Sequence, residues 1–114
     1  MNEPLEGRTK RHLADLSRFG GEAEFIRSHG YEAYTAWTEQ GALLRNAGER
    51  ILIKVATVVE KLPADYKDDH PEIDWAGITR MHNLVSHHYD KVNDDLLWPA
   101  LTVRIPALLT VLGL

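Results

Sequence analysis

Three histidines and one tyrosine lie within one short stretch of the chain, "HNLVSHHY" at 82–89. Histidine titrates near neutral pH, so it can act as a general base or a general acid. RNA cleavage without a metal ion needs a base for the ribose 2′-hydroxyl and an acid for the leaving oxygen. It also needs a cation for the phosphate, a role that arginine fills with paired hydrogen bonds. The stretch supplies the histidines, and its arginine is the open question.

A metal site is one alternative for this histidine cluster. Metal-binding pairs on a helix prefer spacings of three or four residues, which place both ligands on one face. His82 and His87 are five residues apart and His87 and His88 are adjacent, so these side chains diverge. Folding would have to recruit His70 or Asp90 to complete a site. We therefore expect no metal and no cofactor.

Ordinary structural roles are the other alternative. At about 100° per residue, His82 falls between Ile78 and Val85 on the apolar stripe of a helix, and His87 falls at its border. His82 could therefore be a partly buried core or interface residue. His88 could be a solvated residue near the end of the helix.

Apolar residues recur at spacings of three and four along most of the chain, which predicts helices. We expect helices over about 8–28, 32–62, 75–89 and 93–112, with a polar loop at 63–74 and Asp74 as an N-cap. Gly20-Gly21 interrupts the first pattern, and Pro106 should kink the last helix. Gly41 and Gly48 lie on the stripe of the second, which predicts close approach of another helix. The fold class is an all-α antiparallel bundle of four to five helices, one domain over 1–114.

Composition narrows the class of protein further. The 114 residues include no cysteine, which excludes disulfides and thiolate metal sites. The net charge of −4 arises in residues 58–114, and a small basic cluster occurs at Arg8, Lys10 and Arg11. This balance counts against tight, unaided binding of nucleic acid. No signal peptide is apparent, and no window approaches the ~20 apolar residues of a membrane span. We expect a cytoplasmic protein without membrane association.

The sequence around the histidines is similar to a known family. "HNLVSHHYD" at 82–90, after "IDW" at 73–75 and before V-x-x-x-L-L-W at 92–98, resembles the HepT group of HEPN-domain proteins. These proteins are helical toxins of bacterial toxin–antitoxin pairs. Their motif is Arg, four residues, His, one residue, Tyr, usually with asparagine after the arginine. His87 and Tyr89 match it, Asn83 matches the asparagine, and the arginine position falls on His82. The resemblance covers residues 8–112, including "EKLP" and "RIPALL".

The resemblance implies a metal-independent endoribonuclease that acts on mRNA or tRNA at a site formed across a homodimer. It also implies a partner, a minimal nucleotidyltransferase (MNT) antitoxin of a type VII system. That antitoxin transfers AMP from ATP to the motif tyrosine, here Tyr89. A bulky anionic group at the mouth of a phosphate-binding cleft would repel RNA.

The departure at His82 leaves three explanations open. Arg80, seven residues before His87, could substitute for the missing arginine. His82 could work in a paired-histidine site, or the activity could be impaired because histidine is mostly neutral at pH 7 and cannot make the two-pronged contact. We favour impairment. The alternative function is a non-catalytic, dimeric helical module that binds a nucleotidyltransferase.

Overall fold

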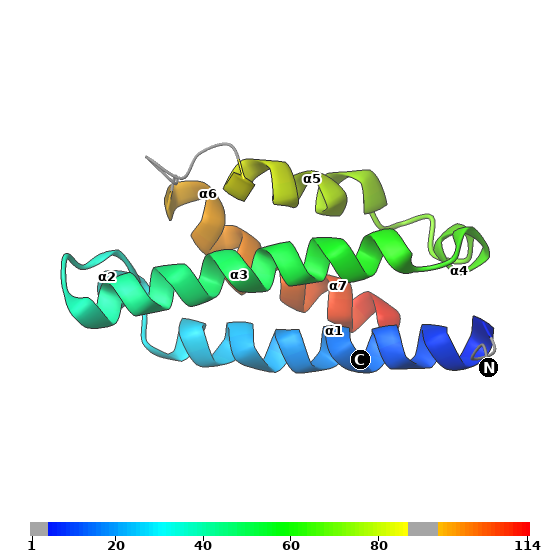
Figure 1. Ribbon diagram of the computed structural model, residues 1–114, viewed down its shortest axis with the longest axis horizontal. Coiled ribbons are helices and arrows are strands. Elements are labelled where there is room, and N and C mark those ends of the chain that lie inside the picture. Colours follow the sequence, from blue (N-terminus) through cyan, green and yellow to red (C-terminus); the bar gives the residue numbers. More distant parts are fainter. Residues whose placement is uncertain (1–4, 87–93) are drawn as a thin grey trace.

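A computed structural model describes residues 5–86 and 94–114, in which every assigned element is helical (Figure 1). The predicted all-α antiparallel bundle is confirmed. Helix α3 lies between α1 and α5, which both run antiparallel to it, and the α6–α7 stretch packs behind α3 (Figure 1). The elements are α1 (Leu5–Ser28), α2 (Tyr31–Thr35), α3 (Glu39–Lys61), α4 (Ala64–Asp68), α5 (Trp75–Ser86), α6 (Asp94–Pro99), the π-helical turn η1 (Ala100–Arg104) and α7 (Ile105–Leu112).

Helix α1 is continuous, so Gly20-Gly21 does not split it. Its predicted stripe is buried at Leu16, Phe19, Ala23 and Ile26. Gly20 lies on the same side, and a Cβ there would collide with the side chain of Leu109 in α7. The glycine therefore permits α7 to pack closely against α1.

The helix predicted over 32–62 is two helices, which corrects the sequence interpretation. Ala36 and Thr38 adopt extended backbone conformations between α2 and α3. The Thr38 side chain accepts a hydrogen bond of 2.9 Å from the Gly41 N–H, an N-cap that starts α3 anew. This corner shifts the helical phase, so Trp37 is 98% exposed although the periodic pattern placed it on the stripe.

The predicted close approach at the two stripe glycines of α3 is confirmed. A Cβ at Gly48 would lie 2.8 Å from Leu101 Cδ1 and 3.1 Å from the Tyr34 hydroxyl oxygen. A Cβ at Gly41 would collide with the carbonyl oxygen of Ala36. Both glycines therefore exist for packing, which offsets their cost of about 1 kcal/mol in a helix interior.

The polar segment at 63–74 contains a short helix, α4, where the sequence predicted a loop. Pro63 precedes its first residue as the N-cap and has an extended backbone conformation. The Trp75 indole N–H lies within hydrogen-bonding distance of the Lys67 and His70 carbonyl oxygens, at 3.1 and 3.2 Å. Trp75 thus ties α4 to the beginning of α5.

The last helical stretch begins with Asp94 and Asp95 in its first turn, where acidic side chains are favourable. The π-helical turn η1 ends two residues before Pro106, which lacks a backbone donor. Such turns accommodate a local break in the hydrogen-bond ladder of a helix. Trp98 and Pro99 both lie inside α6.

Residues Asp94–Leu112 form one helical stretch that is long and apolar enough to cross a membrane by length and composition. The expectation that no window approaches such a span is therefore wrong. Core helices of soluble proteins meet the same criterion, and this stretch buries Leu97, Leu101, Ile105 and Leu108 in the core of the bundle.

Candidate functional site

Helix α5 carries the described part of the histidine-rich stretch. The Asp74 carboxylate accepts a hydrogen bond of 2.9 Å from the Gly77 N–H, as the sequence predicted for an N-cap. Ile78 and Val85 are each 7% exposed and face the core, and α5 packs along α3. Asp74 and this apolar face fix where the polar side chains of α5 point.

His82 is exposed, which corrects its predicted place on the apolar stripe. Met81 takes that place and is 1% exposed. Met81 lies three residues after Ile78 and four before Val85, so it fits the same face. Burial of an apolar thioether is favourable, whereas burial of an imidazole requires hydrogen-bond partners. A buried core role for His82 within the chain is therefore excluded.

Asn83 is exposed beside His82. The two side chains that occupy the arginine and asparagine positions of the motif are thus accessible to a ligand or to a second chain. This accessibility is what the phosphate-contacting part of a nuclease site requires.

Arg80 is held near the beginning of α5. Its guanidinium Nη2 lies 3.9 Å from the Asp74 Oδ2, and both side chains are about two-thirds exposed, at 67% and 69%. A pair this exposed contributes little free energy, so Arg80 can leave it at small cost. The observed position nevertheless directs Arg80 toward Asp74, away from the C-terminal end of α5.

His87, His88, Tyr89 and Asp90 lie outside the described residues. The predictions for His87 as the catalytic histidine and Tyr89 as the modified residue therefore stay predictions. Within the described ranges 5–86 and 94–114, no group of three or more His, Asp or Glu side chains could hold a metal ion.

An aromatic cluster lies where the described chain resumes at α6. The Trp98 ring packs against Tyr31 and Tyr34, with ring centroids 5.8 and 5.1 Å away. The Tyr31 hydroxyl donates a hydrogen bond of 2.9 Å to Asp95 Oδ1, which raises the pKa of Tyr31. Tyr34 is fully buried, and its hydroxyl has no partner among the described atoms. The cluster fixes the start of α6 against α2.

Two carboxylates accompany this aromatic cluster. Burial, and next the charge of Asp94, raise the pKa of Glu49, while Arg45 acts in the opposite direction. Burial also raises the pKa of Asp94, and Arg45 again opposes the shift. Arg45 donates hydrogen bonds of 2.8 Å to the Tyr34 and Ala36 carbonyl oxygens, so it is fixed by the corner between α2 and α3.

Sequence reasoning missed this acidic pair because Glu49 and Asp94 are 45 positions apart and have no shared spacing signal. Only Asp94 gave a signal, as an acid in a helix first turn. Burial disfavours the ionised form of both carboxyl groups, and a carboxylate repels phosphate when it is ionised.

The bundle, with the exposed polar side chains of α5 leading toward the His-x-Tyr sequence, defines an all-α protein of the HEPN superfamily. Within that class, the family described as "Ribonuclease HepT-like" matches residues 10–113. The chain belongs to this HepT-like family, as the sequence motif predicted.

Two curated relatives match parts of the chain. "Putative RNase MJ0127" of Methanocaldococcus jannaschii is 28% identical over 57 residues, which is 50% of this chain and 47% of the relative. "Probable ribonuclease HepT" of Thermococcus cleftensis is 34% identical over 59 residues, which is 52% of this chain and 54% of the relative. The matched region thus spans about half the length of these relatives. No solved structure matches the chain. The description of the family and the names of both relatives designate ribonucleases.

Proposed function

We propose that this protein is the toxin of a type VII HEPN/MNT toxin–antitoxin pair, a metal-independent endoribonuclease that cleaves mRNA or tRNA. The observation that carries the proposal is the family match over residues 10–113. The exposure of His82 and Asn83 supports it, because these are the described residues at the motif positions. Two copies of the chain would face each other with these sides of α5, and so build one site from two motifs.

In this proposal His87 acts as the base and acid of the reaction. It takes the proton of a ribose 2′-hydroxyl, whose oxygen attacks the adjacent phosphorus. The bond from phosphorus to the 5′-oxygen of the next nucleotide breaks, and that oxygen receives a proton from a histidinium, which the second copy can supply. The products are a 2′,3′-cyclic phosphate and a 5′-hydroxyl. Asn83 would donate its amide N–H to a phosphate oxygen.

His82 occupies the position of the phosphate-holding arginine. Because the side chain is exposed, an arginine fits there without displacing the core. We expect His82→Arg to raise the rate of RNA cleavage by at least about tenfold, since it restores a charge-assisted two-pronged contact. The measurement is cleavage of tRNA and mRNA by purified protein, with and without EDTA, and growth of cells that express each form.

Cleavage that survives EDTA and leaves a cyclic phosphate supports the mechanism. Asn83→Ala in the His82→Arg background is the matched variant, and it should lower cleavage without lowering the melting temperature. Intact RNA and normal growth with His82→Arg would sink the nuclease proposal.

The regulatory part of the proposal concerns Tyr89. A neighbouring minimal nucleotidyltransferase would attach AMP through the tyrosine oxygen, with release of pyrophosphate from ATP. Incubation with that protein and ATP should add the mass of one AMP group, and Tyr89→Phe should abolish the gain. An unchanged intact mass would contradict this part.

One observation favours a second candidate, a non-catalytic dimeric module that binds the nucleotidyltransferase. A histidine stands at the arginine position of the motif, and an imidazole cannot make the planar two-pronged phosphate contact of a guanidinium. This candidate predicts AMP transfer to Tyr89 without RNA cleavage by either form of the protein.

A further inference from the structure

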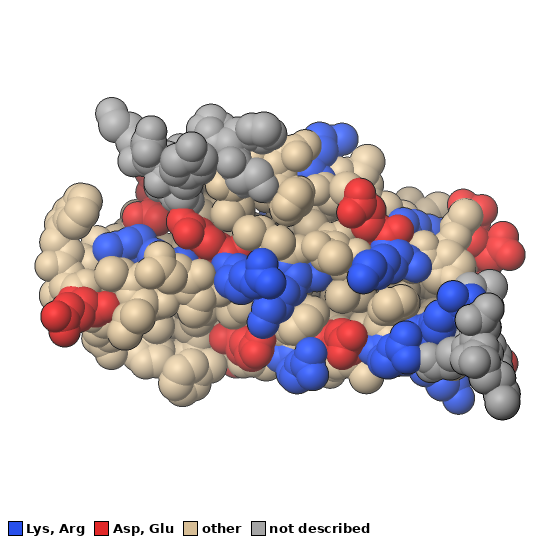
Figure 2. Space-filling view, in the orientation of Figure 1, with Lys and Arg blue, Asp and Glu red and all other residues tan. Residues whose placement is uncertain are grey.

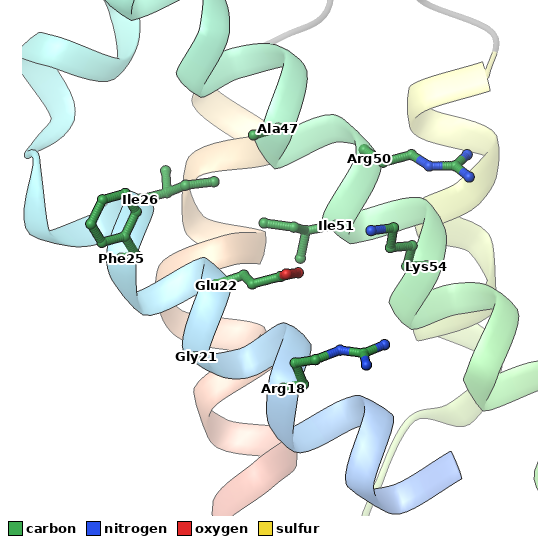
Figure 3. A pocket seen from close by; sticks show the side chains of 9 residues that line it. All are labelled: Arg18, Gly21, Glu22, Phe25, Ile26, Ala47, Arg50, Ile51 and Lys54. Atoms are coloured by element: carbon green, nitrogen blue, oxygen red, sulfur yellow. The ribbon is translucent and has the colours of Figure 1, made fainter. Parts of the chain in front are cut away.

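An open groove of about 580 Å³ runs between α1 and α3 (Figure 3). A second depression of about 280 Å³ shares its three cations, Arg18, Arg50 and Lys54, and extends it toward Thr57 and Val58. The two therefore form one elongated depression, the α1/α3 groove.

The groove is basic although the chain as a whole is acidic. Glu22 is the sole carboxylate side chain among the described residues that line it, against three cations. Figure 2 shows blue side chains gathered at the middle of this face, over α3. The sequence shows a basic cluster only at residues 8–11, because Arg18 comes from a different helix than Arg50 and Lys54.

The cations of the groove are available to an anionic ligand. Arg18 makes a loose, exposed pair with Asp15 at 3.4 Å, and Arg50 has no ion pair within the described part of the chain. The Arg18 guanidinium and the Lys54 ammonium lie 5.1 and 5.4 Å from the centre of the Phe19 ring. Phe19 thus keeps both charges at the groove, without neutralising them.

The groove also has apolar surface. Ile26 and Ile51 lie at its floor, and Phe25 stands at one end with 66% of its surface exposed. Phosphates require cations and unpaired bases require flat apolar partners, and single-stranded RNA presents both chemistries in alternation. Arg50 and Lys54, four residues apart on α3, are separated by about 6 Å along the helix axis, which suits successive backbone phosphates.

The direction of Arg50 connects this groove with the candidate active site. Figure 3 shows Arg50 extending from α3 toward the side on which α5 lies. Helix α5 packs along α3 and carries His82 and Asn83. A strand in the α1/α3 groove can therefore continue over Arg50 to α5.

We propose that the α1/α3 groove binds a single-stranded segment of the RNA substrate, with its phosphates on Arg18, Arg50 and Lys54 and a base on Phe25. This inference rests on the proposed nuclease function. It explains how a chain of net charge −4 can bind RNA, because positively charged side chains are concentrated in one groove.

The test uses a fluorescent oligouridylate with 2′-O-methyl groups, which cannot be cleaved because its nucleophile is blocked. Binding is measured by anisotropy over a series of salt concentrations. Arg50→Gln with Lys54→Gln should weaken binding at least about tenfold and lower the salt slope by about 1.4, or 0.7 for each phosphate contact on single strands. Phe25→Ala should weaken binding about tenfold with an unchanged slope, because stacking releases no counterions.

The matched control is Lys67→Gln with Arg104→Gln, which removes the same charge from α4 and η1 outside the groove. It should leave both affinity and slope unchanged. Equal losses in the control and the groove variant would show a general charge effect and overturn the proposal. So would a wild-type protein that does not bind the oligonucleotide.

Two further outcomes separate this proposal from the nuclease function. If His82→Arg cleaves RNA and the groove substitutions leave its kcat/KM unchanged, the groove proposal fails and the function stands. If the groove variants lose oligonucleotide binding as expected and no form cleaves RNA, the groove stands and the nuclease fails. Binding of a polyglutamate peptide is measured with the same variants. If the groove substitutions abolish peptide binding and leave RNA binding unchanged, the groove binds an acidic protein partner and the RNA proposal fails.

Discussion

At the scale of single residues, exposure and burial on α5 matter most. One position separates Met81, which is buried, from His82, which is exposed. The apolar face of α5 therefore holds the helix against α3, and the described motif residues His82 and Asn83 remain exposed. Arginine can therefore replace histidine at position 82 without disturbing the packing of the core.

Glu49 gives a prediction at this scale. Its pKa is raised, so the folded state favours the protonated carboxyl, and ionisation disfavours folding as the pH rises through that pKa. Glu49→Gln removes this ionisation and should stabilise the protein at pH 7 by less than about 1 kcal/mol, because the group is partly solvated. Urea denaturation at a series of pH values measures the difference.

The advantage of Glu49→Gln should disappear as the pH falls below the ordinary carboxyl pKa of about 4.3. There the glutamate is protonated in both folded and unfolded chains. A stability difference that stays constant from pH 3 to 8 would contradict the assigned cause.

At the scale of elements, the corner between α2 and α3 decides how the long apolar pattern is used. Thr38 caps α3, Gly41 passes beneath the Ala36 carbonyl, and Arg45 donates to that same carbonyl oxygen. These contacts break one predicted helix into two. They also bring Tyr34 against Trp98 at the start of α6.

Gly41→Ala tests this corner. The added Cβ would collide with backbone, which cannot move aside as a side chain can, so we expect a loss of about 1–3 kcal/mol in unfolding free energy. Gly21→Ala is the matched control in α1, where a Cβ meets nothing within 4 Å. That variant should gain about 0.5–1 kcal/mol from helix propensity. Equal effects at the two glycines would refute the close approach.

At the scale of the whole molecule, the apolar α6–α7 stretch packs one side, with Leu97, Leu101, Ile105 and Leu108, into the core of the bundle. Leu101 is 1% exposed and contacts the position of Gly48, whereas Val103 on the same turn is 62% exposed. Leu101→Ala should lower the unfolding free energy by about 2–5 kcal/mol, and Val103→Ala by less than about 0.5 kcal/mol. Chemical denaturation in buffer without detergent measures both.

A Leu101→Ala protein as stable as Val103→Ala would show that this stretch does not form the core. The same comparison distinguishes a helix of the bundle from a membrane helix. In a stretch that faces lipid, the two substitutions would not differ in their effect on the unfolding free energy of the isolated protein.

The sequence by itself determined the fold class, the α1 stripe, the cap at Asp74 and the family, because these depend on local spacing and on a contiguous motif. The single helix predicted at 32–62 was wrong, and the loop predicted at 63–74 was wrong over Ala64–Asp68. The Thr38 corner and α4 depend on contacts with Arg45 and Trp75, which are distant in sequence. The exposure of His82 could not be predicted, because the sequence does not show which of two adjacent residues, Met81 or His82, packs into the core. Tertiary structure alone brought Arg18 of α1 to Arg50 and Lys54 of α3 and Glu49 near Asp94, because a charge cluster built from separate helices exists only after the helices pack.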